Sequence, residues 1–131
     1  MKKILLLIAT VTVLVTACKK DPGLGGDAAI RGKVHVKHYN STFTQFIGEY
    51  DGADLYVYIT YGNHVGYDTR IKSDYKGEFE FRYLYPGDYK VYLYSIDSTL
   101  TEPSGTVAVV NQVHLNGRKE QYDLGTIDIF N

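Results

Sequence analysis

The sequence has 131 residues, 44% of them hydrophobic, and its 14 Lys and Arg against 15 Asp and Glu give a formal net charge of −1. The charges alternate in sign and form no basic block, which argues against nucleic-acid binding through a basic face. Cys18 is the single cysteine, so an intramolecular disulfide is excluded. Thirteen tyrosines without a tryptophan are typical of a β-rich chain rather than a helical one.

The first eighteen residues predict a targeting segment. A short cationic start over residues 1–3 precedes an apolar run over residues 4–15. This run is too short for a permanent membrane span, which takes about 20 apolar residues, but it has the length of a signal-peptide core. It ends in Val15-Thr16-Ala17-Cys18. This end resembles the lipobox of bacterial lipoproteins, in which small residues precede the cleavage site and the cysteine thiol carries a diacylglyceryl group.

The lipobox resemblance implies that residues 1–17 are a cleaved signal peptide and that Cys18 is acylated. Two or three acyl chains, at about 0.8 kcal/mol per buried methylene, would hold the chain on a membrane of the cell envelope, which we expect to be the outer membrane. The alternatives are a buried cysteine, an uncleaved anchor or an ordinary secretory signal. Surface lipoproteins of the Bacteroidetes often carry several acidic residues after the cysteine. Here only Asp21 is acidic, so surface exposure stays open.

Residues 18–29 predict the acylated cysteine and a flexible tether, because Gly23, Gly25 and Gly26 punctuate them. Such a tether has a root-mean-square reach of roughly 15–20 Å. Residues 30–131 are then one domain. Removing residues 1–17 takes away two lysines, so twelve basic residues face fifteen acidic ones and the mature charge is −3.

The domain shows no apolar period of 3.6 residues that would predict a long helix. Alternation of period two recurs between turn residues spaced roughly 8–12 positions apart, which indicates an all-β sandwich or barrel of seven or eight strands. Residues 39–50 break this alternation and predict a loop or an insertion. The expected strands are residues 30–38, 53–61, 67–73, 78–83, 88–96, 106–110, 112–115 and 125–130.

Four segments in order carry a further resemblance: residues 30–34, 52–57, 73–81 and 84–91, the last two forming a D-x-x-G-x-F-x-F-x-x-L-x-P-G-x-Y run. Together they resemble the carboxypeptidase regulatory-like and collagen-adhesin B-type domains, over about residues 30–130. The resemblance implies a Greek-key, transthyretin-like (prealbumin-like) sandwich. Because such sandwiches serve as spacers, binding modules and appendages, it says almost nothing about function.

No catalytic or metal site can be nominated from the sequence. The histidines are scattered, and His35 and His38 are three apart on a strand, so they point to opposite faces. Asp51 with Asp54, or Asp74 beside a turn, lacks the ligand density of a calcium loop. We therefore expect no metal, no cofactor and no enzymatic activity. A small envelope hydrolase, the least favoured alternative, would need converging polar groups that the sequence does not name.

The tyrosines form the one constellation that stands out. Tyr56 and Tyr58 lie on one face of the strand at 53–61, and Tyr92 and Tyr94 on one face of the strand at 88–96. If the two strands share a sheet, these four line its outer surface. That surface could stack on sugar rings or dock a protein partner. Alternatively, the tyrosines stabilise an exposed sheet by cross-strand pairing, or residues 39–50 cover them.

The leading functional hypothesis is a membrane-anchored, non-catalytic binding or assembly module whose partner is a protein or a glycan. An accessory glycan-binding lipoprotein that uses the tyrosines is the alternative.

Overall fold

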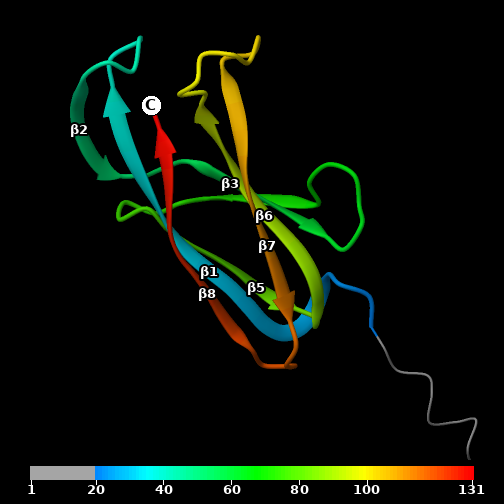
Figure 1. Ribbon diagram of the computed structural model, residues 1–131. Coiled ribbons are helices and arrows are strands. Elements are labelled where there is room, and N and C mark those ends of the chain that lie inside the picture. Colours follow the sequence, from blue (N-terminus) through cyan, green and yellow to red (C-terminus); the bar gives the residue numbers. More distant parts are fainter. Residues whose placement is uncertain (1–19) are drawn as a thin grey trace, which may run out of the picture.

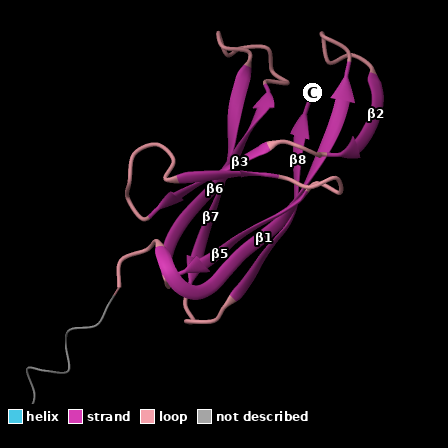
Figure 2. Cartoon of the chain, turned by 180° about the vertical axis from the view of Figure 1, so that it is seen from behind, coloured by secondary structure: helices cyan, strands magenta, loops and turns pink. Residues whose placement is uncertain are grey.

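The computed structural model describes residues 20–131, which form two four-stranded β-sheets (Figure 1). The predicted signal peptide and Cys18 lie outside the described residues. Within residues 20–131 no helix occurs, and so none is long and apolar enough to span a membrane (Figure 2). The predicted all-β sandwich is confirmed. Its eight strands are β1 (Leu24–Tyr39), β2 (Phe46–Asp51), β3 (Tyr56–Tyr61), β4 (Thr69–Lys72), β5 (Glu78–Leu84), β6 (Gly87–Ile96), β7 (Thr106–Leu115) and β8 (Gln121–Phe130).

The first sheet is built around β1, which is long enough to pair with three strands. On one side β8 runs parallel to β1, paired from Ala29 opposite Gln121 to Lys37 opposite Phe130 with one shift of register between Arg31 and Lys33. On the other side β5 pairs antiparallel with the first half of β1, and β2 pairs antiparallel with its second half. We call this four-stranded sheet sheet A.

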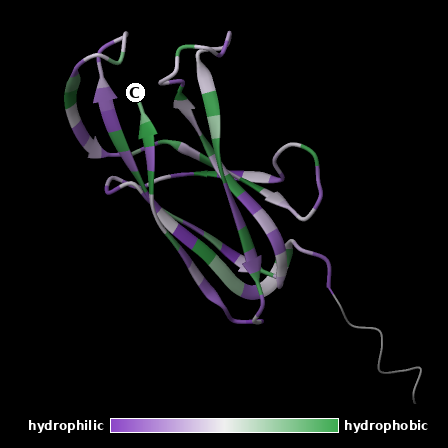
Figure 3. Cartoon of the chain, in the orientation of Figure 1, coloured by the Kyte–Doolittle hydropathy of each residue, from purple (hydrophilic) through white to green (hydrophobic). Residues whose placement is uncertain are grey.

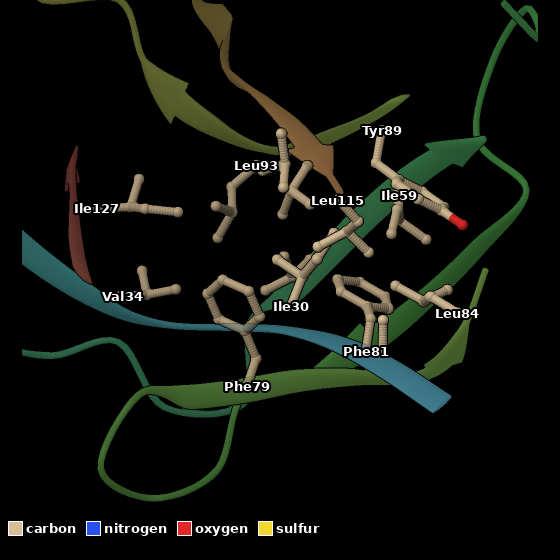
Figure 4. Close-up of a cluster of buried hydrophobic side chains, with 14 of the residues drawn as sticks. Ile30, Val34, Ile59, Phe79, Phe81, Leu84, Tyr89, Leu93, Leu115 and Ile127 are labelled. Carbon is tan, nitrogen blue, oxygen red and sulfur yellow. The ribbon is translucent and has the colours of Figure 1, made fainter. Parts of the chain in front are cut away.

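The second sheet, sheet B, has the order β4-β3-β6-β7, and all its pairs are antiparallel. The core lies between the two sheets, where side chains from both meet (Figure 4). Period-two alternation produces this arrangement, because every second residue of a strand points inward. The same alternation is visible as bands of hydropathy along the strands (Figure 3). The largest fully buried side chains are Tyr89, Ile30, Ile59, Leu84, Leu93, Leu115, Val34, Val36, Val57 and Val91.

The loop or insertion predicted over residues 39–50 is too long, because only residues 40–45 lie outside the strands. Strand β1 continues to Tyr39, and β2 begins at Phe46 after a short turn. Five of the six β2 residues are exposed, because β2 is an edge strand that pairs only with the outer half of β1. A strand with so little burial needs no apolar alternation, which is why the pattern failed to reveal it.

The tether predicted over residues 18–29 is also too long, because β1 begins at Leu24. Ala28 is fully buried. A side chain at Gly26 would overlap the Leu84 carbonyl, so this glycine allows β5 to approach closely rather than making the chain flexible. Just before the strand, the Gly23 N–H donates to the Tyr89 hydroxyl over 2.8 Å, and the Tyr85 N–H donates to the Gly23 carbonyl over 2.9 Å.

Two further boundaries differ from the prediction. The expected strands at 106–110 and 112–115 are one strand, since Asn111 keeps its place in the ladder opposite Val91. The last strand begins at Gln121 rather than Gly125. Gly125 has a positive φ of 73° at the point where the pairing between β1 and β8 shifts register. This irregularity breaks the period-two pattern and concealed the first half of the strand.

A candidate binding site on the tyrosine face

The four predicted tyrosines come together on the outer face of sheet B. Strands β3 and β6 are neighbours in this sheet, and Tyr58 lies directly opposite Tyr92 in the ladder. Tyr56 and Tyr94 follow on the same face, one alternation further along their strands. Tyr67, from the loop between β3 and β4, packs against Tyr58 with ring centroids 5.0 Å apart. We call these five residues the tyrosine face.

Tyr58 is the centre of the tyrosine face. Its ring stacks on Tyr92 at a centroid distance of 5.3 Å and an interplanar angle of 14°. The Tyr94 ring meets it edge-on at 5.6 Å and 77°. Such contacts are each worth about 0.5–1.5 kcal/mol beyond the area that they bury. Cross-strand pairing therefore accounts for Tyr58 and Tyr92, which are half-buried.

The remaining rings of the tyrosine face stay open. Tyr94 is 53% exposed, Tyr67 51% and Tyr56 42%. Residues 39–50 do not cover them, because β2 pairs with β1 in sheet A. The interpretation that this segment shields the tyrosines is therefore wrong.

A hollow opens where β3 and β6 separate. Their ladder runs from Tyr61 opposite Tyr89 to Tyr58 opposite Tyr92 and ends there. Beyond that point lies a cavity of about 170 Å³, which connects the tyrosine face with apolar side chains of the interior. Its lining consists of Tyr56, Tyr58, Tyr94, Leu55, Leu93 and Ile129.

Two cations from β4 complete this face. The guanidinium carbon of Arg70 lies 4.1 Å from the Tyr56 ring centroid, and the Lys72 ammonium lies 5.1 Å from the same ring. Interaction with Tyr58 is the main cause that raises the pKa of Arg70, and bonding to Asp54 raises the pKa of Lys72. Burial, followed by neighbouring tyrosines, raises the pKa of Tyr92. At neutral pH, Tyr92 is therefore uncharged and the two β4 side chains are cationic.

Sequence reasoning missed Tyr67 and Arg70 as members of this site. Neither the loop conformation nor the placement of β4 beside β3 can be read from alternation along a single strand. One signal in the sequence could have revealed Arg70. Arg70 and Lys72 share a face of the expected strand that follows Tyr56 and Tyr58, and a hairpin between these two strands brings the four side chains together.

Elsewhere, many charged side chains pair with one another. On the outer face of sheet A, a groove of about 530 Å³ is lined by Arg31, Lys33 and several carboxylates. The histidines also have partners: His64 lies 2.7 Å from Asp68 and His114 lies 2.6 Å from Asp88. Among residues 20–131, no three His, Cys, Asp or Glu side chains converge as a metal site would require.

No known protein family matches the chain, and no curated protein matches its sequence. Among solved structures it is similar to a Pseudomonas aeruginosa protein named "putative carbohydrate binding protein", with a TM-score of 0.45 and 12% identity over 83% of this chain and 91% of that one. It is also similar to part of a 9R-lipoxygenase from Cyanothece, with a TM-score of 0.34 and 13% identity over 95% of this chain and 20% of that one. At such identities and TM-scores, neither similarity carries an argument about what this chain binds.

Proposed function

We propose that the chain is a lipoprotein precursor whose mature form is a non-catalytic binding module, and that the tyrosine face binds a glycan. In this proposal residues 1–17 are removed, Cys18 is acylated, and the lipid holds the domain on an envelope membrane, the outer membrane in a bacterium that has one. The domain is a transthyretin-like sandwich. The observation that carries the binding role is the set of exposed tyrosines around a hollow with an apolar lining.

The strand order supports the transthyretin-like assignment. After the β3–β4 pair the chain crosses to β5 in sheet A and returns as β6, which lies beside β3. This interleaving of successive strands is the connectivity of a Greek key.

Tyrosine has the properties that a sugar ligand requires. The phenyl ring can pack against the apolar C–H face of a sugar ring, and the hydroxyl can exchange hydrogen bonds with the sugar hydroxyls. The cavity of about 170 Å³ is smaller than the pockets of about 300–1,000 Å³ that enclose small molecules. We therefore infer that the ligand is extended and lies across the tyrosine face, with one group entering the hollow.

Cross-strand stabilisation explains only part of the tyrosine face. It accounts for the half-buried Tyr58 and Tyr92, but not for the surface that Tyr94 and Tyr67 leave open, since each is about half exposed despite its contact with Tyr58. Contiguous exposed aromatic surface is typical of interaction sites.

Affinity electrophoresis in gels that contain polysaccharides tests the binding role. We expect retention of the wild-type protein, and at least a tenfold loss of affinity in Tyr56→Ala/Tyr94→Ala, because aromatic anchors at interfaces often contribute about 1 kcal/mol or more each. Tyr75→Ala is the matched control, since Tyr75 is 79% exposed and lies outside this face. Absence of wild-type retention in every glycan gel would remove the glycan and leave a protein partner as the remaining ligand class.

Metabolic labelling with an alkyne fatty acid tests the anchor. In a bacterium that expresses the full chain, we expect the label to appear on the wild-type protein in the membrane fraction. Cys18→Ser should abolish labelling and retain the precursor length. A wild-type protein that is soluble and unlabelled would overturn the anchoring proposal while leaving the binding role intact.

A further inference from the structure

Among the strand cations of residues 20–131, Arg70 combines two properties: no carboxylate pairs with it, and its guanidinium stacks on a tyrosine ring. Lys90, on the outer face of β6, likewise forms no ion pair with another described residue. Arg70 lies on β4 opposite Tyr58, and among residues 20–131 no acidic side chain is within ion-pair distance of its guanidinium. Lys72, its neighbour on the same face, is 3.0 Å from Asp54. Three β1 cations on sheet A are paired likewise: Arg31 with Asp123, Lys33 with Asp51, and Lys37 with Asp128.

Stacking fixes the direction in which Arg70 can bind. Its guanidinium carbon lies 4.1 Å from the centroid of the Tyr56 ring, which is a cation–π contact. The N–H donors of a guanidinium lie in its own plane, so a group held over a ring presents them sideways rather than into the ring. This fork of donors matches the two oxygens of a carboxylate. A lysine ammonium offers no such fork.

The surroundings of Arg70 favour an anion at this place. The mature chain has a formal net charge of −3, so its overall field does not attract anions. Near the tyrosine face, however, the acidic groups are already engaged. Asp54 pairs with Lys72, and Asp68 accepts the Tyr61 N–H over 2.7 Å and contacts His64. The field over the tyrosine face is therefore set by Arg70, together with Lys90, which projects from β6 on the same face as Tyr92.

We propose that the tyrosine face selects glycans that carry carboxylates, that is, polymers with uronic acid residues, and that Arg70 binds the carboxylate. This inference rests on the proposed glycan-binding function. Tyr56 links the two parts of the site, because it lines the hollow and also carries Arg70 over its ring. A sugar ring packed on the tyrosines thus brings a carboxylate substituent within the range of the guanidinium.

The experiment compares polysaccharides that differ only in charge. Alginate, polygalacturonate and hyaluronan are each tested beside their carboxyl-reduced forms, by affinity electrophoresis and by calorimetry with the soluble oligomers. We expect at least one acidic polymer to bind the wild-type protein about tenfold or more tightly than its reduced form, which corresponds to about 1.4 kcal/mol. Arg70→Gln should abolish this preference, and Arg70→Lys should restore only part of it.

Arg31→Gln is the matched control, because it makes the same substitution at an arginine of sheet A that lies outside the tyrosine face. It should leave most of the preference intact. A further measurement needs no variant: the Arg70 Nε–H NMR signal of the wild-type protein should shift with the acidic oligomer and not with the reduced one.

Equal affinity for acidic and reduced polymers, or a preference that survives Arg70→Gln, would overturn the role of Arg70 while leaving the glycan proposal intact. Absence of binding to both forms of every polymer and to the neutral glycans would overturn the glycan proposal itself.

Discussion

The outer faces of the two sheets follow the same alternation and differ in chemistry. On sheet A the outward residues of β1 are cationic, and carboxylates from β2 and β8 pair with them. On sheet B the outward residues of β3 and β6 are tyrosines that contact one another. In both sheets the inward residues form the core, so the core does not determine which residues face outward. The difference between the two faces is therefore the best guide to where this domain acts.

The two faces also differ in what they contribute to stability. Exposed ion pairs contribute about 0–1 kcal/mol each, because solvent screens them. Aromatic pairs contribute about 0.5–1.5 kcal/mol. Sheet A must then be held mainly by its backbone and its buried side chains, whereas sheet B gains part of its stability from its outer face.

A substitution at Gly77 tests whether backbone contacts are a main source of stability in sheet A. The Gly77 carbonyl accepts the Val34 N–H over 2.8 Å, and a side chain at Gly77 would overlap the Val34 carbonyl. With a φ of +78°, it is also in a conformation that favours glycine. We expect Gly77→Ala to lower the free energy of unfolding by about 2–4 kcal/mol in urea denaturation.

Gly66→Ala is the control for Gly77→Ala. Gly66 has a φ of +79°, but an added side chain would meet nothing within 4 Å. Gly66→Ala should therefore lower the free energy of unfolding by about 1 kcal/mol, through backbone strain alone. If the two variants lost the same free energy of unfolding, the close approach of Gly77 to Val34 would make no contribution to stability.

Double-mutant cycles compare the outer faces directly. The cycle for Tyr58→Leu and Tyr92→Leu should give a coupling free energy of about 0.5–1.5 kcal/mol. The cycle for Arg31→Gln and Asp123→Asn should give less than about 0.5 kcal/mol, since both side chains are more than half exposed. A larger coupling free energy on sheet A than on sheet B would contradict the view that the outer face of sheet B contributes more to stability.

The smallest effect is expected at the loop between β6 and β7, and only in acid. Asp97 accepts hydrogen bonds from Thr99, Thr101 and Glu102, and these bonds, led by the one from the Thr99 hydroxyl, lower its pKa well below the usual range. Because the folded pKa is the lower one, the stability that Asp97 adds is complete above the ordinary aspartate pKa of about 4 and is lost as the pH falls below it. NMR amide signals of residues 97–105 should report the loss.

In Asp97→Asn these amide signals should no longer follow the titration of residue 97. If they followed the same profile as in the wild-type protein, the acid response of the loop would have another origin.

The sequence predicted those parts of the fold that burial dictates. Phe79, Phe81 and Val91 alternate with polar residues because they face the core, and their strands were found with small boundary errors. Segments whose conformation depends on a distant neighbour were missed. Gly26 looked like a flexible residue, but it is needed for the approach of β5. Strand β2 has almost no buried side chain, so it left no pattern.

The sequence likewise predicted only part of the candidate site. Tyr58 and Tyr92 could be placed on outward faces from alternation alone, but their register as direct partners depends on the tertiary pairing of β3 and β6. Arg70 and Tyr67 join the site only because β4 and its loop fold back beside β3. Information of that kind is absent from local periodicity.

The hydrogen bonds of Gly23 limit the distance between the domain and the membrane in the proposed lipoprotein. Since the chain is fixed from Gly23 onward, only four residues separate Cys18 from that point. At 3.3–3.6 Å per residue, the five steps from Cys18 to Gly23 would place the domain at most roughly 16–18 Å from the acylated cysteine. If Cys18 is acylated as proposed, the domain would meet ligands only in a thin layer above the bilayer. Within that layer, a polymer attached to the same membrane would have a high effective concentration at the domain, and this would strengthen weak contacts at a shallow face.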